Sequence, residues 1–114
     1  MLKPEEFFHL LSDETRLRCL LLLQAKNELC VCDFTYALQS AQPKISRHLA
    51  ILRGSKAVTY RRAGAWIYYS LSQQLPKWAC NILSNLKKDT NLKTLYLSDL
   101  TRLNERDRSL CEIP

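Results

Sequence analysis

The pattern of apolar and polar positions predicts helices over the first part of the chain. Apolar residues at helical spacing indicate a short helix over residues 4–11, with a proline tolerated near its start. A second helix is expected over residues 13–25, because Ser12, Asp13 and Glu14 supply an N-cap and first-turn acids. Leucines cover more than half of its surface, so we expect this helix to form the core.

Two further short helices, joined by a tight turn, are predicted next. The spacing of apolar residues indicates a helix over residues 30–39 and another over 44–53, with the turn at residues 40–43. In the second of these helices Ile45, Leu49 and Leu52 should face inward, which leaves a polar and basic outer face. This pairing is the helix-turn-helix pattern, whose second helix enters the major groove of DNA.

A β-hairpin is predicted directly after the second of these helices. Residues 57–62 and 65–71 are rich in β-branched and aromatic side chains, and Gly64 between them can take the positive φ that a hairpin turn demands. A basic hairpin in this position is a wing. The predicted fold is therefore mainly α with a β-hairpin wing, a winged helix-turn-helix.

The remainder of the chain is less sharply patterned. Residues 76–88 read as another amphipathic helix, the pattern after Asp89 permits one more, and the last ten residues look loose. We expect a winged helix-turn-helix domain for DNA binding and dimerisation over residues 1–88. Residues 89–114 would form a C-terminal extension, partly helical or flexible.

Length and composition point to a small cytoplasmic protein. The 114 residues suit one domain. A domain of this size has a small core, and self-association would help to complete it. No apolar run reaches membrane-spanning length and the N-terminus lacks a signal segment, so we expect no membrane partner. The five cysteines are an odd number in a chain without secretory features, which favours reduced thiols over disulfides.

The net charge of +6 is concentrated in the middle of the chain. No Asp or Glu stands between Phe34 and Lys88, whereas nine basic residues do: Lys44, Arg47, Arg53, Lys56, Arg61, Arg62, Lys77, Lys87 and Lys88. On a helix-turn-helix this distribution predicts binding to double-stranded DNA. An enzyme is not expected, because the basic centre has no paired carboxylates or Ser/His/Asp arrangement, and Gly54 and Gly64 form no phosphate loop.

The candidate DNA contacts lie in the predicted fourth helix and in the wing. Arg binds guanine and Gln binds adenine through paired hydrogen bonds, while Ser bonds either a base or a phosphate. Lys and Ser at the helix start would hold phosphate with the backbone amides, and arginines at the wing tip would follow the backbone or enter a minor groove. His48 is ambiguous, since it could instead close the turn against the third helix. The candidates are Gln42, Lys44, Ser46, Arg47, His48, Arg61 and Arg62.

Two cysteines carry the candidate ligand chemistry. Cys30 and Cys32 lie at the start of the predicted third helix, beside Lys26 and the positive end of the helix dipole, a setting that favours thiolate. Cys19 and Cys80 are interpreted as packing residues, and Cys111 as incidental or as a mobile extra ligand. Sulfur-only sites select soft acceptors such as As(III), Sb(III), Cu(I), Cd(II), Pb(II) or Zn(II). Tetrahedral zinc needs four ligands, so two thiolates plus at most one more suit a trigonal pnictogen better.

The position of the thiols suggests a switch. Residues two apart on a regular helix point about 200° away from each other, so chelation would unwind or prevent the first turn of the helix over 30–39. A bias of a few kcal/mol would then suffice to release DNA. Two alternatives stay open. Cys30 and Cys32 could respond to oxidation, through mixed disulfides or pairing with Cys111, or the chain could bind DNA without responding to any ligand.

Four motifs together resemble those of the ArsR/SmtB family of winged-helix repressors, in its arsenic-responsive branch. They are LSDETRL at 11–17, ELCVCD at 28–33, QPKISRHL at 42–49 and GxWxxYxL at 64–71, within a match over roughly residues 8–83. The resemblance implies a homodimer on a twofold-symmetric operator, repression of an arsenic-resistance operon, and release on arsenite or antimonite without a required cofactor. It also implies a dimer interface built from the first and last helices, here residues 4–11 and 76–88.

One departure from the family pattern concerns the inducer. The arsenite motif of similar proteins adds a third cysteine three residues after the second, and this chain has Thr35 there. Either Cys111 supplies a third thiolate or the site binds through two. Arsenite has three exchangeable positions and a singly methylated arsenical has two, so a two-thiol site would favour the methylated form. The divalent-metal branch uses acid and His ligands on its last helix, and residues 76–88 hold nothing equivalent.

Overall fold

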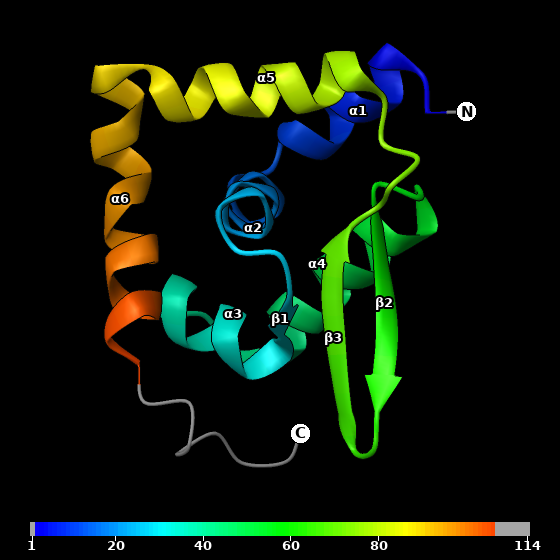
Figure 1. The fold of residues 1–114 in the computed structure, drawn as a ribbon, viewed down its shortest axis with the longest axis vertical. Coiled ribbons are helices and arrows are strands. Elements are labelled where there is room, and N and C mark those ends of the chain that lie inside the picture. Colours follow the sequence, from blue (N-terminus) through cyan, green and yellow to red (C-terminus); the bar gives the residue numbers. More distant parts are fainter. Residues whose placement is uncertain (1, 107–114) are drawn as a thin grey trace.

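The computed structural model describes residues 2–106, apart from the side chains of Lys93 and Leu95. In chain order the elements are α1 (Pro4–Leu11), α2 (Glu14–Ala25), β1 (Leu29–Cys30), α3 (Val31–Leu38), α4 (Gln42–Gly54), β2 (Val58–Ala63), β3 (Trp66–Leu71), α5 (Lys77–Lys88) and α6 (Thr90–Glu105). The strands form one antiparallel sheet in the order β1-β3-β2. A mainly helical body with a projecting hairpin confirms the predicted fold class (Figure 1).

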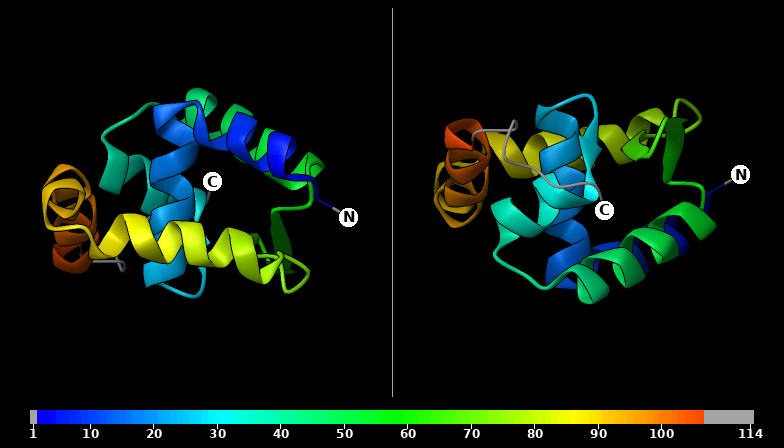
Figure 2. Two further views of the ribbon diagram at one scale, coloured as in Figure 1. Left: turned by 90° about the horizontal axis from the view of Figure 1, so that it is seen from above. Right: turned by 90° about the horizontal axis from the view of Figure 1, so that it is seen from below.

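Helix α2 runs through the middle of the molecule, with α6 along one side and the hairpin on the other (Figure 2). The carboxylate of its N-cap, Asp13, accepts hydrogen bonds from the backbone amides of Thr15 at 2.9 Å and Arg16 at 3.3 Å. Residues 19–23 are all buried, so the helix is apolar around most of its circumference. The prediction that α2 forms the core is confirmed.

The helix-turn-helix consists of α3 and α4. Helix α3 ends where Gln39 takes a left-handed conformation, with φ 53°, and α4 begins at Gln42, two residues earlier than predicted. Ile45, Leu49 and Leu52 are completely buried, as the spacing predicted. The buried side of α4 is therefore fixed by the core, and the opposite side is left to solvent.

A short strand that the sequence pattern did not predict precedes α3. Leu29 and Cys30 form β1, where they pair with Tyr69 and Tyr68 of β3. Cys30 has extended backbone, with φ −90° and ψ 169°, and is the N-cap of α3. The prediction that the helix includes Cys30 is wrong, because pairing with β3 holds this residue in the sheet.

The wing is formed by β2 and β3. Ala63 pairs with Trp66, and the loop between them is Gly64-Ala65. Gly64 has φ 63°, which confirms its predicted role in the turn. Figure 1 shows the hairpin extending away from the helical body.

Helix α6 confirms the additional helix that the pattern permitted after Asp89. It turns sharply from the end of α5 and runs toward α3 (Figure 1). Its residue Leu103 is 6% exposed and belongs to the same core as α2. The expected division after residue 88 stays a prediction, and the segment expected to be loose falls almost wholly outside the described residues. No helix within residues 2–106 is long and apolar enough to cross a lipid bilayer.

Candidate functional site

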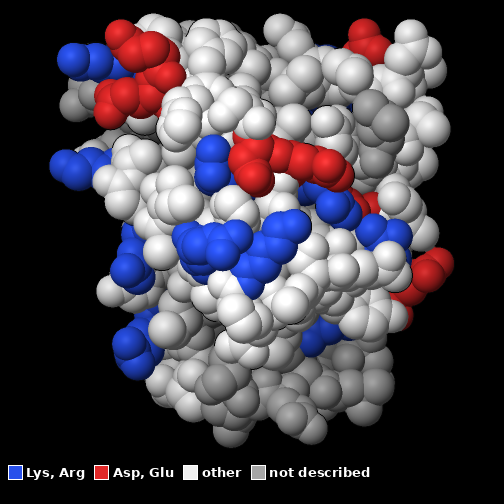
Figure 3. Space-filling view, turned by 180° about the vertical axis from the view of Figure 1, so that it is seen from behind, with Lys and Arg blue, Asp and Glu red and all other residues white. Residues whose placement is uncertain are grey.

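The outer side of α4 carries four of the predicted DNA contacts. Gln42, Lys44, Ser46 and Arg47 are all exposed in its N-terminal half. The first amides of a helix lack partners within it, so this helix start also offers hydrogen-bond donors to an anion. Figure 3 shows one face of the molecule on which Lys and Arg side chains gather in a band across the middle. The surface suits a polyanion.

His48 does not lie on this outer side. His48 is 6% exposed, and its imidazole has Nδ1 3.3 Å from Nη1 of Arg16 and Nε2 3.8 Å from Oδ2 of Asp13. Burial lowers the pKa of His48, against the opposing effect of the Asp13 carboxylate. The structure therefore buries His48 beside Asp13 and Arg16 at the start of α2, a position that does not favour a direct contact with DNA. Its spacing from Ile45 and Leu52 is the sequence signal that matched the buried side.

Arg61 is set back from the wing tip where the sequence placed it. Its Nε and Nη2 donate to the two carboxylate oxygens of Glu28, at 2.6 and 2.9 Å, and its guanidinium lies 4.9 Å from the ring centroid of Tyr68. The hydrogen bond from Arg61 lowers the pKa of Glu28. Arg62, the next residue toward the turn, is exposed. Within the wing, Arg62 is thus better placed than Arg61 for an anion.

The thiol of Cys30 is bound to a buried carboxylate. Cys30 is 3% exposed, and both its backbone amide and its Sγ donate to Oδ2 of Asp33, at 2.9 and 3.3 Å. The other oxygen of Asp33, which is itself fully buried, accepts from Arg106. The thiol of Cys30 thus lies in hydrogen-bond contact with an acid, and the predicted thiolate character of Cys30 stays a prediction.

Cys32 lies two residues further along the chain and is partly exposed. It is the second residue of α3, and its carbonyl oxygen accepts from Oγ1 of Thr35 at 2.9 Å. Because Cys30 precedes the helix, the predicted 200° separation of the two thiols does not apply, and chelation need not unwind a turn that contains both. Among residues 2–106, no three His, Cys, Asp or Glu side chains gather as metal ligands would. Cys111, the possible third ligand, lies outside the described residues.

Two other cysteines are parts of the core. Cys19 is completely buried in α2, and burial raises the pKa of its thiol to about 12. Cys80 is partly buried on α5 against the core. The prediction that Cys19 and Cys80 serve packing is consistent with both positions. Of the cysteines within residues 2–106, Cys30 and Cys32 remain as the candidate ligands.

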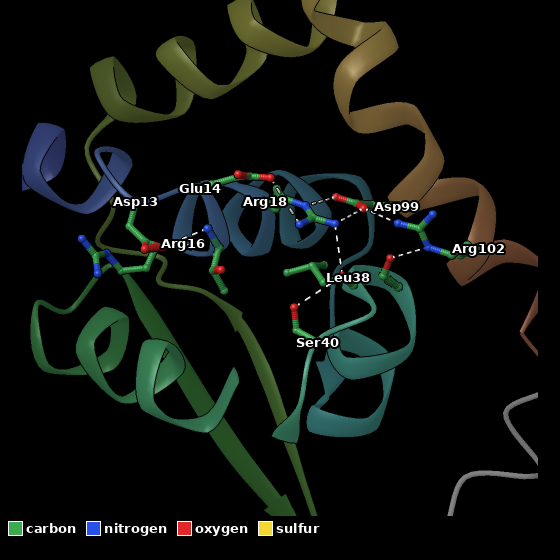
Figure 4. A network of polar contacts seen from close by, with 10 residues as sticks. Asp13, Glu14, Arg16, Arg18, Leu38, Ser40, Asp99 and Arg102 are labelled. Carbon is green, nitrogen blue, oxygen red and sulfur yellow. Dashed lines mark hydrogen bonds and ion pairs between the residues drawn. The ribbon is translucent and has the colours of Figure 1, made fainter. Parts of the chain in front are cut away.

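A charged network between three helices was missed by sequence reasoning. Asp99 of α6 is 2% exposed and accepts hydrogen bonds from Arg18 of α2 and Arg102 of α6 (Figure 4). Both arginines also donate to backbone carbonyls at the end of α3, those of Leu38 and Ala37. An acid followed three residues later by an arginine reads as an exposed helix pair, so the sequence gave no sign of burial.

The chain is similar to known bacterial regulators. Residues 13–59 match the family model described as bacterial regulatory protein, arsR family. The arsenical resistance operon repressor of Escherichia coli (strain K12) is 51% identical over 82 residues, which cover 72% of this chain and 70% of that protein. The arsenic resistance transcriptional regulator ArsR1 of Pseudomonas putida (strain KT2440) is 45% identical over 105 residues, which cover 92% and 80%.

A solved structure shares the fold of this chain. Reduced HlyU from Vibrio cholerae N16961 superposes with a TM-score of 0.64 at 28% identity, over 71% of this chain and 81% of that one. The Escherichia coli and Pseudomonas putida relatives are an operon repressor and a transcriptional regulator by name, and the matched family is one of regulatory proteins. This confirms the prediction that the chain is not an enzyme. The chain belongs to the ArsR family of winged helix-turn-helix transcriptional repressors.

Proposed function

We propose that this chain represses an arsenic-resistance operon and leaves its operator when trivalent arsenic or antimony binds Cys30 and Cys32. The observation that carries the proposal is the position of the two thiols, on either side of the first residue of α3. The other end of α3 leads through residues 39–41 into α4. A ligand at the thiols therefore acts on the helix that orients the DNA-reading side. The names of the two relatives above, both concerned with arsenic resistance, support this assignment.

Operator binding is assigned to the N-terminal half of α4. Inserted in a major groove, Arg47 would pair with guanine and Gln42 with adenine, while Lys44 and Ser46 would join the first amides of the helix in holding phosphate. Arg62 would bind a phosphate from the wing, and Arg61 would do so only by exchanging its carboxylate partner. His48 has no direct part in this scheme, because it is buried.

A homodimer would present two copies of α4 to the two halves of a symmetric operator. Helices α1 and α5 are the proposed interface. Phe7 of α1 meets Trp78 of α5 edge-on, with ring centroids 5.6 Å apart, which joins the two helices into one surface. Phe8, beside Phe7, is 55% exposed, the kind of large apolar side chain that association covers.

Inducer binding would break the contacts that hold Cys30. Each thiol exchanges with an As–OH group: an As–S bond forms, an As–O bond breaks, and the thiol proton leaves with the hydroxide as water. The Sγ of Cys30 then has no proton to donate to Asp33, now 3.3 Å away. Drawing Cys30 and Cys32 to one arsenic atom also strains the N-cap of α3 and the pairing with Tyr68. A bias of a few kcal/mol toward the strained form releases DNA.

A singly methylated trivalent arsenical is the proposed preferred inducer. Two thiols satisfy its two exchangeable positions, whereas arsenite keeps one hydroxyl unless a third thiol joins. The position of a third cysteine in the family motif is occupied by Thr35, whose hydroxyl donates to the Cys32 carbonyl. Cys111 is the remaining source of a third thiolate, and a Cys111→Ser variant separates the two cases.

The test is fluorescence anisotropy of labelled promoter DNA with reduced protein, at fixed salt because phosphate contacts make affinity salt-dependent. Arsenite, antimonite, methylarsenite, Cd(II) and Zn(II) are titrated into the complex. We expect release by the trivalent pnictogens and little effect of Zn(II). Release by peroxide alone would favour the oxidative switch, and a complex insensitive to every reagent would favour the ligand-independent DNA-binding protein.

A further inference from the structure

We infer that α6 is a positioning element for operator binding, which acts through Asp99 and Arg102 on the end of α3. The inference rests on the proposed function, because the position of α3 matters for operator binding and release. Helix α6 lies outside residues 13–59 that match the family model. Its role is therefore argued from its contacts in this chain alone.

Asp99 fixes two arginines in one orientation each. Its Oδ1 accepts from Nη2 of Arg18 at 2.6 Å and from Nη2 of Arg102 at 2.7 Å, and its Oδ2 accepts from Nε of Arg18 at 2.8 Å. Asp99 is 2% exposed, so its carboxylate is shielded from bulk water. Charge-assisted, bidentate hydrogen bonds of this kind are both strong and directional.

The two oriented arginines converge on the last turn of α3. Nε of Arg102 donates to the carbonyl oxygen of Ala37 at 2.7 Å, and Nη2 of Arg18 donates to that of Leu38 at 3.3 Å (Figure 4). Carbonyls at a helix end lack partners within the helix, and cations there also complement its dipole. The network thus caps α3 immediately before Gln39, where the chain leaves for α4.

Helix α6 also reaches the thiol end of α3. Arg106, its C-cap, donates to Asp33, whose other oxygen holds the amide and thiol of Cys30. The Arg106 guanidinium lies 5.8 Å from the ring centroid of Tyr36. Helix α6 therefore contacts α3 at both ends: at Asp33, beside Cys30, and at Ala37, before the turn that leads into α4. Loss of the hydrogen bond between Cys30 and Asp33 would change the surroundings of Arg106. Helix α6 connects Arg106 to Arg102, which binds the carbonyl of Ala37 at the other end of α3.

The Asp99→Asn substitution tests this role, because the positioning role and the change in net charge predict opposite changes in DNA affinity. The change keeps the side-chain shape but adds one unit of positive net charge, so long-range attraction alone would tighten DNA binding. Loss of the α3 cap predicts operator affinity weaker by about tenfold. Arg102→Ala should weaken binding in the same direction, and Arg102→Lys should recover part of it.

Two control variants isolate the effect. Asn104→Ala alters the exposed side of α6. Lys26→Ala removes one positive charge, as Arg102→Ala does, from an exposed position outside α1, α5 and the helix-turn-helix. Both should leave operator affinity close to the parent value. Circular dichroism melts fix an assay temperature at which every variant is folded. If Asp99→Asn does not fold, Arg102→Ala, whose side chain is 26% exposed, carries the test alone.

Two readouts separate this inference from the proposed function. A folded Asp99→Asn protein that binds the operator as tightly as the parent, or more tightly, overturns the role of α6. If the parent itself neither binds DNA nor responds to arsenicals, the proposed function fails, and hydrogen exchange decides the positioning role. Faster exchange at the amides of residues 39–42 in Asp99→Asn than in Asn104→Ala supports it, and equal exchange overturns it.

Discussion

The thiol of Cys30 donates a hydrogen bond to the carboxylate of Asp33 at 3.3 Å, inside the protein and at the start of α3. The same carboxylate oxygen accepts the Cys30 amide, so one acid holds both the helix cap and the candidate ligand. An arsenic atom that binds the sulfur of Cys30 would therefore break the hydrogen bond between Cys30 and Asp33. In the proposed switch, loss of this contact would alter the start of α3 and, through it, the helix-turn-helix.

Thr35→Cys should raise affinity for arsenite relative to methylarsenite. The new thiol stands at the position where the family motif has a third cysteine, so arsenite would gain a third As–S bond and methylarsenite would not. We expect the preference to move by about tenfold or more, the scale of a typical coupling energy. Competition between the two arsenicals in the anisotropy assay measures it, with Cys111→Ser in the background. An unchanged preference would refute the two-thiol account of the inducer.

Arg47→Ala should weaken specific operator binding by about 1–3 kcal/mol, the usual cost of losing a base contact. Arg62→Ala should weaken binding to specific and random DNA alike, because a phosphate contact carries no sequence information. Titration of operator and scrambled duplexes at several salt concentrations distinguishes the two. Equal losses on both duplexes for Arg47→Ala would show that this residue holds phosphate instead of reading a base.

Glu28→Gln should tighten DNA binding beyond the effect of its charge. The substitution removes the carboxylate that now holds Arg61, and the released guanidinium can bind a phosphate near the wing. Glu105→Gln makes the same change in net charge at an exposed position outside the proposed dimer interface and serves as the matched control. If both variants bind operator equally well, the Glu28–Arg61 pair does not restrain the wing.

Stability should fall as the pH is lowered below about 6.5, because of His48. Burial lowers the pKa of His48 from its ordinary value of 6.5, so the unfolded chain takes up its proton at a higher pH than the folded one. The contribution of neutral His48 to the free energy of unfolding is fully present above pH 6.5, and it is lost as the pH falls toward the pKa of His48 in the folded protein. Thermal melts at pH 7.5 and 5.5 measure the loss, which His48→Gln should reduce and His9→Gln should not. The pKa of Asp13 is also lowered, but this affects stability only below the ordinary value of 3.8, outside the pH range of these melts.

The helices with strong internal periodicity were predictable from the sequence, and the contacts between distant segments were not. The leucine-rich α2 and the inward side of α4 follow from local spacing, as does the turn at Gly64. Strand β1 is only two residues long and exists because Tyr68 and Tyr69 pair with it, which no local pattern reveals. Cys30 was therefore misplaced by a single residue, enough to move it from helix to sheet.

Buried charge was also invisible to the sequence. Asp99 and Arg102 read as solvated helix residues, since nothing local indicates that α6 folds back onto α3. His48, by contrast, stands at a spacing that places it on the buried side with Leu49, so its position was predictable. The candidate DNA contacts of α4 could be predicted because the apolar residues of this helix are regularly spaced, so the remaining positions must face solvent.

The most direct test of the account is release of operator DNA by methylarsenite from the parent protein and from the Cys30→Ser, Cys32→Ser double variant. Cys80→Ser, which alters a partly buried thiol of α5, is the matched control. We predict that all three proteins bind the operator with similar affinity, and that the parent and the control release it while the double variant stays bound. Release of the double variant at the same methylarsenite concentration as the parent would contradict the assignment of these two thiols as the sensor.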